Sequence, residues 1–297
     1  MSKTPDLKVL NPSDFFENNL GNLLEIPDSP KQLWVQGKMP TADIKLLAVV
    51  GSRKYTSYGK QVLDYLIDSL AGYPVGIVSG LAIGIDTLAH EAALRNNLYT
   101  LAVPGSGLDN SVLYPAQNKG LAERVVGGGG GLLSEMSPLS AAAPWTFPKR
   151  NRLMAGLCPA TILIEAGEKS GTLITARLVA DYNRELLAVP GSIFSKNSFG
   201  THQFLKLGAT LVTEASDILE ILKISKKTTE ENKEKITLSP QAEKVIKLLF
   251  EPQEKDVLIR KLNTDLNLSV AEASILLMEL EMQDLIIYNA PFYRSLI

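Results

Sequence analysis

Short apolar runs alternate with amphipathic stretches over most of the first 222 residues. The apolar runs lie at residues 46–50, 76–78, 100–103, 131–133, 161–164, 185–189 and 210–212. Helix-like stretches separate most of them; Val62, Leu66, Ile67 and Leu70, for example, share one helical face. Runs this short and apolar are typical of strands covered on both faces, as in a parallel sheet. The alternation predicts an α/β fold with a doubly wound, mostly parallel sheet of about seven strands.

The end of the chain has a different pattern. Ser239 followed by Pro240 predicts a helix start, and Ser269 with Glu272 three positions later predicts a capping box. A further helix and a two-stranded hairpin are expected at residues 255–262, 285–288 and 292–294. Three helices followed by a hairpin predict a small winged-helix-like domain.

Polar and charged residues dominate 223–235 and predict a solvated linker. The expected organisation has four parts: a lead-in segment at 1–40, an α/β domain at 41–222, a charged linker at 223–237 and a winged-helix-like domain at 238–297.

Composition excludes several classes of protein. Of the 297 residues, 45% are apolar, which excludes wholesale disorder. No apolar run approaches the ~18 to 20 residues of a membrane span, and the first residues lack a secretory signal, so we expect a cytoplasmic protein without a membrane partner. Cys158 is the single cysteine, and the two histidines, His90 and His202, are not at ligand spacing, so neither a disulfide framework nor a metal site is expected. His90 follows an apolar helical stretch and is expected to be structural.

A net charge of −2 argues against a uniformly basic nucleic-acid surface. Residues 41–222 carry 15 cations and 15 anions, whereas residues 236–297 carry 6 and 9. A neutral domain can still concentrate its cations on one face, so the average charge does not decide the function.

Three turns that could bind an anion follow predicted strands: Gly51-Ser52-Arg53, Ser79-Gly80 and Ser170-Gly171-Thr172. Parallel strands place such turns at one sheet edge, where glycine allows close backbone approach and helix N-termini favour anions. Each turn alone is commonly just a strand–helix connection. Together they favour a ligand that carries phosphate.

Known nucleotide-binding motifs are incomplete in this sequence. Gly105-Ser106-Gly107 is followed by Asn110 where a dinucleotide fingerprint needs glycine, and Gly59-Lys60 is followed by Gln61 where a P-loop needs Ser or Thr. The G-x-S-x-G elbow of hydrolases is absent from the sequence. We therefore expect no bound cofactor and no hydrolysed triphosphate, whereas the missing elbow does not by itself exclude Ser-His-Asp catalysis.

The densest cation cluster of the α/β domain is Phe147-Pro148-Lys149-Arg150-Asn151-Arg152. Its cations beside Phe147 and Trp145 could neutralise phosphates and stack bases, a combination typical of single-stranded nucleic-acid binding. The alternative is a solvated helix start with the two aromatic rings packed inside.

These motifs together resemble the DprA (Smf) family of bacterial DNA-processing proteins. The resemblance covers about residues 25–222 and extends to the C-terminal domain. The motifs that carry it occur in this order: Val50-Gly51-Ser52-Arg53, Ser79-Gly80-Leu81-Ala82-Ile83-Gly84-Ile85-Asp86, Gly107-Leu108-Asp109 with Tyr114-Pro115, Phe147-Pro148-Lys149-Arg150-Asn151-Arg152, and Ser170-Gly171-Thr172-Leu173-Ile174-Thr175-Ala176.

The resemblance implies an extended Rossmann-like domain that binds and protects incoming single-stranded DNA, forms a homodimer and loads the RecA recombinase during natural transformation, without known enzymatic activity. The DNA-binding residues that it implies are Gly51, Ser52, Arg53, Ser79, Gly80, Phe147, Lys149, Arg150, Asn151, Arg152, Gly171 and Thr172.

Three features depart from the family pattern. The first 40 residues are too few for the helical N-terminal domain of many members, and the glycine run at 127–131 suggests only a flexible loop. The expected recognition helix, 269–283, has no Lys or Arg but contains Glu272, Glu279 and Glu281, so phosphates should repel it. We therefore expect the C-terminal domain to bind protein or to regulate.

Two other functions remain open from the residues. A Rossmann-like nucleotide phosphoribohydrolase of the lysine-decarboxylase-like group would explain Gly171 and Thr172, but Lys169 and Thr175 replace a glycine and the glutamate of its signature. A small-nucleotide sensor with a winged-helix output would use the same pocket.

Overall fold

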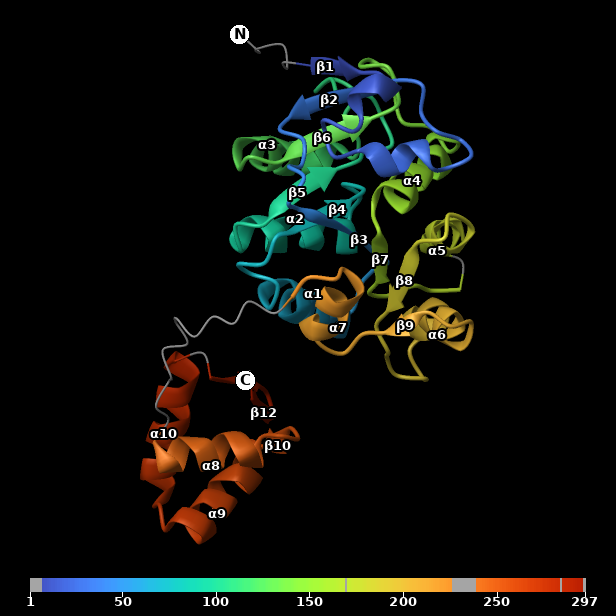
Figure 1. Ribbon diagram of the computed structural model, residues 1–297. Helices are drawn as coiled ribbons and strands as arrows, with labels where there is room; N and C mark the ends of the chain where they lie inside the picture. Colours follow the sequence, from blue (N-terminus) through green and yellow to red (C-terminus); the bar gives the residue numbers. More distant parts are fainter. Residues whose placement is uncertain (1–6, 169, 226–238, 284, 296–297) are drawn as a thin grey trace. The chain divides into compact units, whose positions relative to one another are not determined.

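The computed structural model describes residues 7–168, 170–225, 239–283 and 285–295 (Figure 1). The chain divides into two compact units, residues 1–227 and 228–297. The first unit is built on a large sheet covered by helices, and the second combines three helices with a small sheet. Most of the expected linker, 223–237, lies outside the described residues.

Every apolar run predicted as a strand forms one. In the described part of the first unit, nine strands form a single sheet in the order β1-β2-β6-β5-β4-β3-β7-β8-β9. The strands are β1 (Leu7–Leu10), β2 (Leu33–Gly37), β3 (Lys45–Val50), β4 (Val75–Ser79), β5 (Tyr99–Ala102), β6 (Gly131–Ser134), β7 (Ala160–Leu163), β8 (Glu185–Ala188) and β9 (Thr210–Leu211). All neighbouring pairs from β6 to β9 are parallel. The predicted doubly wound, mostly parallel sheet is therefore confirmed.

Helices cover both faces of this sheet. One face carries α1 (Ser57–Asp68), α2 (Ile85–Arg95), α3 (Lys119–Gly127) and α7 (Ala215–Ile221). The other carries α4 (Thr146–Leu157), α5 (Thr172–Asp181) and α6 (Phe199–Lys206). Short 3-10 helices complete the unit: η1 (Pro12–Asp14), η2 (Gly21–Leu24), η3 (Ala116–Asn118) and η4 (Lys196–Ser198). Within the described ranges, no helix combines the length and the apolar character needed to cross a membrane.

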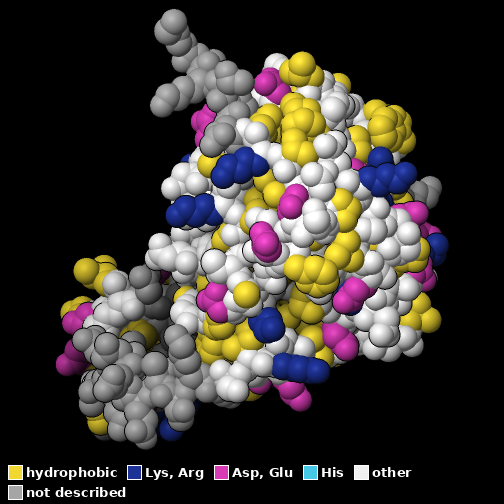
Figure 2. Space-filling view, turned by 45° about the horizontal axis from the view of Figure 1, so that its top comes forward, with side chains coloured by type: hydrophobic (Ala, Val, Ile, Leu, Met, Phe, Trp, Pro, Cys, Tyr) yellow, Lys and Arg dark blue, Asp and Glu magenta, His cyan; other side chains and the backbone are white. Residues whose placement is uncertain are grey.

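Charged side chains are dispersed on the face of the molecule shown in Figure 2. Lysine and arginine side chains lie there singly, between acidic and apolar ones. A broad basic surface is therefore not a feature of this face, as the net charge of −2 leads one to expect.

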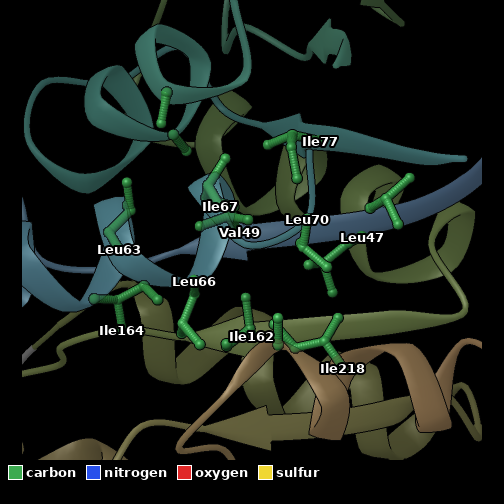
Figure 3. Packing of buried hydrophobic residues seen from close by; sticks show 14 of the residues in the cluster. Leu47, Val49, Leu63, Leu66, Ile67, Leu70, Ile77, Ile162, Ile164 and Ile218 are labelled. Atoms are coloured by element: carbon green, nitrogen blue, oxygen red, sulfur yellow. The ribbon is translucent and has the colours of Figure 1, made fainter. Parts of the chain in front are cut away.

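Alternate residues of β3 point to opposite faces of the sheet. Leu47 and Val49 pack with Leu63, Leu66 and other side chains of α1, α2 and α7 (Figure 3). Leu46, Ala48 and Val50 pack on the other face, with α4 and the N-terminal segment. Because both faces are covered, the strand is apolar at nearly every position.

The expected lead-in segment is part of the same sheet. Strands β1 and β2 extend it through antiparallel pairing of β2 with β6. Phe15 and Leu20, between them, are fully buried in the core beneath α4. Asn22 ties the segment to α4 by donating from Nδ2 to the Leu157 carbonyl (2.9 Å).

The glycine run at 127–131 forms a tight connection from α3 to β6 rather than an open loop. Gly129 has a φ of +88°, and a Cβ on Gly130 would lie 2.2 Å from the Thr100 carbonyl oxygen. Gly131 pairs with Gly37 of β2. Larger side chains are excluded at Gly130 and Gly131 because two strands and a helix end converge there, whereas Gly127 and Gly129 have open space around the Cβ position.

The second unit contains the predicted helices and hairpin. Its elements are α8 (Pro240–Leu248), β10 (Gln253–Glu254), α9 (Lys255–Leu266), α10 (Val270–Met282), β11 (Ile286–Asn289) and β12 (Phe292–Ser295). Ser239 caps α8, and Ser269 and Glu272 form the expected capping box of α10. The additional strand β10 pairs with β12, which gives the sheet order β10-β12-β11. This is the element order of a winged helix.

Candidate functional site

The strand order of the large sheet reverses at β3. Strand β4 lies on one side of β3 and β7 on the other, so the connections that follow β3 and β7 diverge at the carboxyl edge. Such a switch point is where doubly wound sheets bind ligands. A cleft of about 620 Å³ opens there. We call it the strand-end cleft; its walls include Gly51, Ser52, Arg53, Lys54, Asp86, Phe147, Arg150, Asn151, Met154, Gly171, Thr172, Thr175 and Asn197.

The loop after β3 is held tightly against the start of α2. A Cβ on Gly51 would lie 2.6 Å from Cγ1 of Ile85, and Gly84, with a φ of +93°, would place a Cβ 2.5 Å from the Ser52 carbonyl oxygen. The Ser52 hydroxyl bonds the Lys54 backbone, accepting from its N–H (3.0 Å) and donating to its carbonyl (2.9 Å). The loop is thereby fixed, and it presents the exposed side chains of Arg53 and Lys54.

Arg53 lies on an aromatic pair at the mouth of the cleft. Its guanidinium carbon is 5.5 Å from the centroid of the Phe147 ring, a cation–π distance. Phe147 packs at 5.7 Å against Tyr114, and it fits over Gly105, where a Cβ would approach its ring to 2.7 Å. Stacking orients the guanidinium while leaving its N–H groups for an anion.

Arg150 forms the floor of the cleft and is only 7% exposed. Its Nη1 donates to the carbonyl oxygens of Gly80 (2.5 Å) and Val103 (2.7 Å), and its Nε donates to Oδ1 of Asn151 (2.9 Å). Burial raises the pKa of nearby Asp86, while the positive charge of Arg150 acts in the opposite direction. The floor therefore carries a cation whose position is set by two strand ends.

The N-terminus of α5 faces the cleft from the opposite wall. The Thr172 hydroxyl donates to the Gly51 carbonyl (3.2 Å) and accepts from the Ser170 hydroxyl (2.8 Å). Gly171 precedes the helix and is exposed. The partial positive charge of a helix N-terminus thus adds to those of Arg53 and Arg150.

The structure brings most of the predicted site residues together in the strand-end cleft: Gly51, Ser52, Arg53, Phe147, Arg150, Asn151, Gly171 and Thr172. Ser79 and Gly80 lie behind it. The fully buried Ser79 hydroxyl donates to the Val49 carbonyl (2.7 Å), and the Gly80 carbonyl accepts from Arg150. These two residues support the floor and do not line the cleft.

Lys149 and Arg152 lie on another side of α4, in a second hollow of about 760 Å³ that we call the side hollow. Nη2 of Arg152 donates to both carboxylate oxygens of Glu135 (2.7 and 2.6 Å), and its Nη1 donates to the Asp28 carbonyl. Lys149 keeps 43% of its side chain exposed, with Nζ 3.5 Å from Glu135. The alternative interpretation of this cluster is a solvated helix start with Trp145 and Phe147 packed inside. It is wrong, because Arg150 and Arg152 are buried whereas Trp145 is 63% exposed.

The predicted site residues did not include Lys54, Asp86, Thr175 and Asn197, which are polar residues of the cleft. Lys54 directly follows Arg53, and this adjacency was a signal that a second cation stands on the same loop. Asn197 comes from the connection after β8 and donates from Nδ2 to the Lys54 carbonyl (2.8 Å). Nothing in the local sequence around Asn197 marks it.

His90 is structural, as predicted. It is fully buried, and its Nδ1 lies 2.7 Å from the Thr100 hydroxyl oxygen. Burial lowers the pKa of His90 to about 4. In the described part of the chain, no group of three or more His, Cys, Asp or Glu residues could hold a metal ion.

The carboxylates near the cleft are engaged by the fold. Asp86 accepts from the N–H groups of Gly80 (3.1 Å) and Ala82 (3.3 Å). Glu165 accepts from the backbone and the hydroxyl of Thr56 (2.9 and 2.6 Å) and lines a different hollow. Thr175, where the phosphoribohydrolase signature has its glutamate, lines the cleft as a nearly buried hydroxyl.

Comparison with known proteins identifies relatives of the first unit. The model of a family described as DNA recombination-mediator protein A matches residues 13–223. Protein Smf of Escherichia coli is 40% identical over 200 residues, which are 67% of this chain and 53% of that protein. DNA processing protein DprA of Streptococcus pneumoniae is 42% identical over 198 residues, which are 67% of this chain and 69% of that protein. The chain thus spans about half the length of the first relative.

Two solved structures share the fold. DprA of Streptococcus pneumoniae superposes with a TM-score of 0.67 at 38% identity, covering 72% of this chain and 74% of that one. DNA processing protein A of Helicobacter pylori, whose structure is described in terms of a single-stranded DNA binding mode, superposes with a TM-score of 0.63 at 29% identity, covering 73% of this chain and 96% of that one. The second unit, 228–297, lies beyond the range that the family model matches.

Proposed function

Since the chain belongs to the DNA recombination-mediator protein A family, we propose that it binds single-stranded DNA in the strand-end cleft and delivers the strand to a RecA-type recombinase. The observation that carries the proposal is the position of Arg53. Its guanidinium stacks on the Phe147 ring, and both residues line the same cleft as buried Arg150. A phosphate site and an aromatic surface are therefore adjacent. A nucleotide requires both.

The charge and shape of the cleft suit a single strand. Arg53, Lys54 and Arg150 outnumber Asp86, which faces Arg150. The cleft, of about 620 Å³, has the size of sites that hold a drug-sized ligand, about 300–1,000 Å³. A base of an unpaired strand can enter it, whereas a base inside a duplex cannot leave its stack without an energetic penalty. Contacts to phosphate and ring face carry little base preference.

Delivery to RecA, protection of incoming DNA during transformation and action in the cytoplasm are part of the same proposal. The description of the family as a recombination mediator supports the first of these.

Homodimerisation through the first unit is supported by its edge strand β9. Leu211 on this strand and Leu207 just before it are 50% and 73% exposed, so within the described residues this sheet edge offers unpaired backbone groups and apolar side chains to a second copy.

The second unit is proposed to bind protein rather than a DNA groove. Helix α10 contains no Lys or Arg, and Glu272 and Glu279 are exposed on it. It buries Leu277 and Leu280 in the core of the unit yet also exposes Met278 (62%) and Met282 (84%). An exposed apolar stripe with acidic neighbours favours a basic amphipathic partner segment, because it repels phosphate and attracts lysine or arginine.

Fluorescence titration of the full chain with single- and double-stranded oligonucleotides tests DNA binding. With about four phosphates contacted, log K should fall with log salt at a slope of roughly −3, from ~0.7 per phosphate. Arg53→Ala should weaken single-strand binding about tenfold or more, because a hydrogen-bonded charge contact contributes about 1.5–3 kcal/mol, and it should make the slope shallower.

Lys45 and Lys54 form a matched pair for this experiment. Both are exposed, but Lys45 begins β3 at the opposite edge of the sheet, whereas Lys54 lies in the cleft. Lys54→Ala should weaken binding and Lys45→Ala should not. Equal affinity for duplex and single strand, or an Arg53→Ala protein that binds as the wild type does, would contradict the proposal. Displacement of the strand by an equal concentration of mononucleotide would favour a nucleotide sensor instead.

A further inference from the structure

The side hollow adjoins the strand-end cleft. Pro148 and Ile174 line both, so the two depressions meet where α4 and α5 present these side chains. Ile174 is 46% exposed at this border. A chain that fills the cleft and continues over Pro148 and Ile174 therefore enters the side hollow.

We propose that the side hollow is a second subsite for single-stranded DNA, in which Lys31 binds a phosphate and Tyr182 stacks on a base. This inference rests on the proposed binding of a single strand in the strand-end cleft. It adds a direction to that binding, because the strand would run from Arg53 across the border residues toward Lys31.

The charges of the side hollow favour a phosphate at Lys31. Three cations and two anions line it: Lys31, Lys149, Arg152, Asp28 and Glu135. Glu135 is already bound by Arg152 through both oxygens and lies near Lys149. Lys31, in contrast, is exposed and has no ion-pair partner among the residues that the structure describes. Its ammonium group is therefore the cation most open to an incoming phosphate.

The apolar part of the hollow is suited to a base. Tyr182 is half-buried at the end of α5, packed against the core that lies beneath α4, and its ring lines the hollow with Leu178 and Ile174. Aromatic rings beside a basic groove are the usual platform for unpaired bases, since every base has a stacking face. At about 760 Å³, the side hollow is no smaller than the cleft and has the size of a site for a ligand as large as a nucleotide.

Titration of the full chain with oligothymidylates of graded length tests this subsite. Lengths from about 3 to about 20 nucleotides bracket the site sizes of single-strand binding folds, about 4–16 nucleotides. Wild-type affinity should rise with length in two stages, first as the cleft fills and then as the side hollow fills. Tyr182→Leu, which keeps an apolar side chain in the core, should remove only the second rise and weaken long oligomers about fivefold or more.

Lys31→Ala is the second variant. Because Lys31 is exposed, the substitution should leave the fold intact, and circular dichroism of the variant checks this. For long oligomers it should make the salt slope shallower by about 0.7, the effect of one phosphate on a single strand. Lys45→Ala, an equal change of charge at the opposite sheet edge, should bind every length as the wild type does.

Failure of this inference is distinguishable from failure of the proposed function. If Arg53→Ala weakens every length while Lys31→Ala and Tyr182→Leu bind long oligomers as tightly as the wild type, the side hollow is not a subsite. Equal losses for short and long oligomers in Lys31→Ala would also overturn the inference, because they would place Lys31 at the first nucleotides. If Arg53→Ala has no effect at any length, the proposed function itself is wrong.

Discussion

Acidification should destabilise the first unit through His90. The Thr100 hydroxyl donates to the Ile77 carbonyl (2.9 Å), so its oxygen accepts from Nδ1–H of His90 at 2.7 Å. Nε2 of His90 is then the atom that a second proton must occupy, and within the described residues it is buried without a hydrogen-bond partner. Burial lowers the pKa of His90 to about 4; the charge of Arg150 acts in the same direction, and the Ser79 backbone acts against it.

The sign and size of the effect follow from this pKa. The ordinary pKa of histidine, 6.5, applies to the unfolded chain, so the unfolded state takes up the proton first as pH falls. Stability is complete above pH ~6.5 and decreases by about 1.4 kcal/mol per pH unit down to pH ~4. Between pH 7 and pH 5 the loss is about 2 kcal/mol.

Urea unfolding followed by tryptophan fluorescence measures this loss. The two tryptophans, Trp34 and Trp145, both lie in the first unit, so the signal reports that unit alone. The free energy of unfolding should fall by about 2 kcal/mol more in the wild type than in His90→Gln between pH 7 and pH 5. The difference between the two proteins removes the contribution of other titrating groups. Parallel losses in the two proteins would refute the reasoning about His90.

Three further predictions concern other positions in the first unit. Arg152→Met should lower the free energy of unfolding by about 1.5–3 kcal/mol, because partly buried Glu135 loses both hydrogen bonds from Arg152 and keeps only Lys149, 3.5 Å away, and adding Glu135→Leu should restore most of this loss in urea unfolding; a double variant as unstable as the single one would contradict this. Gly84→Ala should cost about 1–3 kcal/mol for its φ of +93° and also weaken DNA binding, because its Cβ displaces Ser52. Gly72→Ala, with a φ of +79° but open space around the Cβ, should leave DNA binding unchanged. Burial raises the pKa of the Cys158 thiol, so a thiol reagent should modify it only after urea unfolding, and rapid labelling of the native chain would show that Cys158 is accessible.

Strands covered on both faces were predictable because nearly all of their residues are apolar. β3 and β7 are examples, with nearly every residue buried. The edge strand β1 was missed for the opposite reason. Its sequence, Leu7–Leu10, leaves Lys8 and Val9 exposed, so it forms no apolar run. Only pairing with β2 makes it a strand, and that pairing is not a local property of the sequence.

The cleft was predictable residue by residue only in part. In α4, Phe147, Arg150, Asn151 and Met154 follow the i, i+3, i+4, i+7 spacing of one helical face, and all four line the cleft. Arg152 is two residues from Arg150 and must point elsewhere. The sequence showed a cluster of cations. Which of them point into the cleft, however, depends on which face of α4 packs against the sheet.

The contacts of Arg150 and Thr172 have a consequence for hydrogen exchange. Arg150 joins α4 to the ends of β4 and β5, and Thr172 joins α5 to the loop after β3. Segments fastened in this way should open as one cooperative unit, so their backbone amides should report a common free energy of opening rather than fraying separately. Before any strand arrives, the cleft is already in shape, and the ordering entropy of binding falls on the DNA.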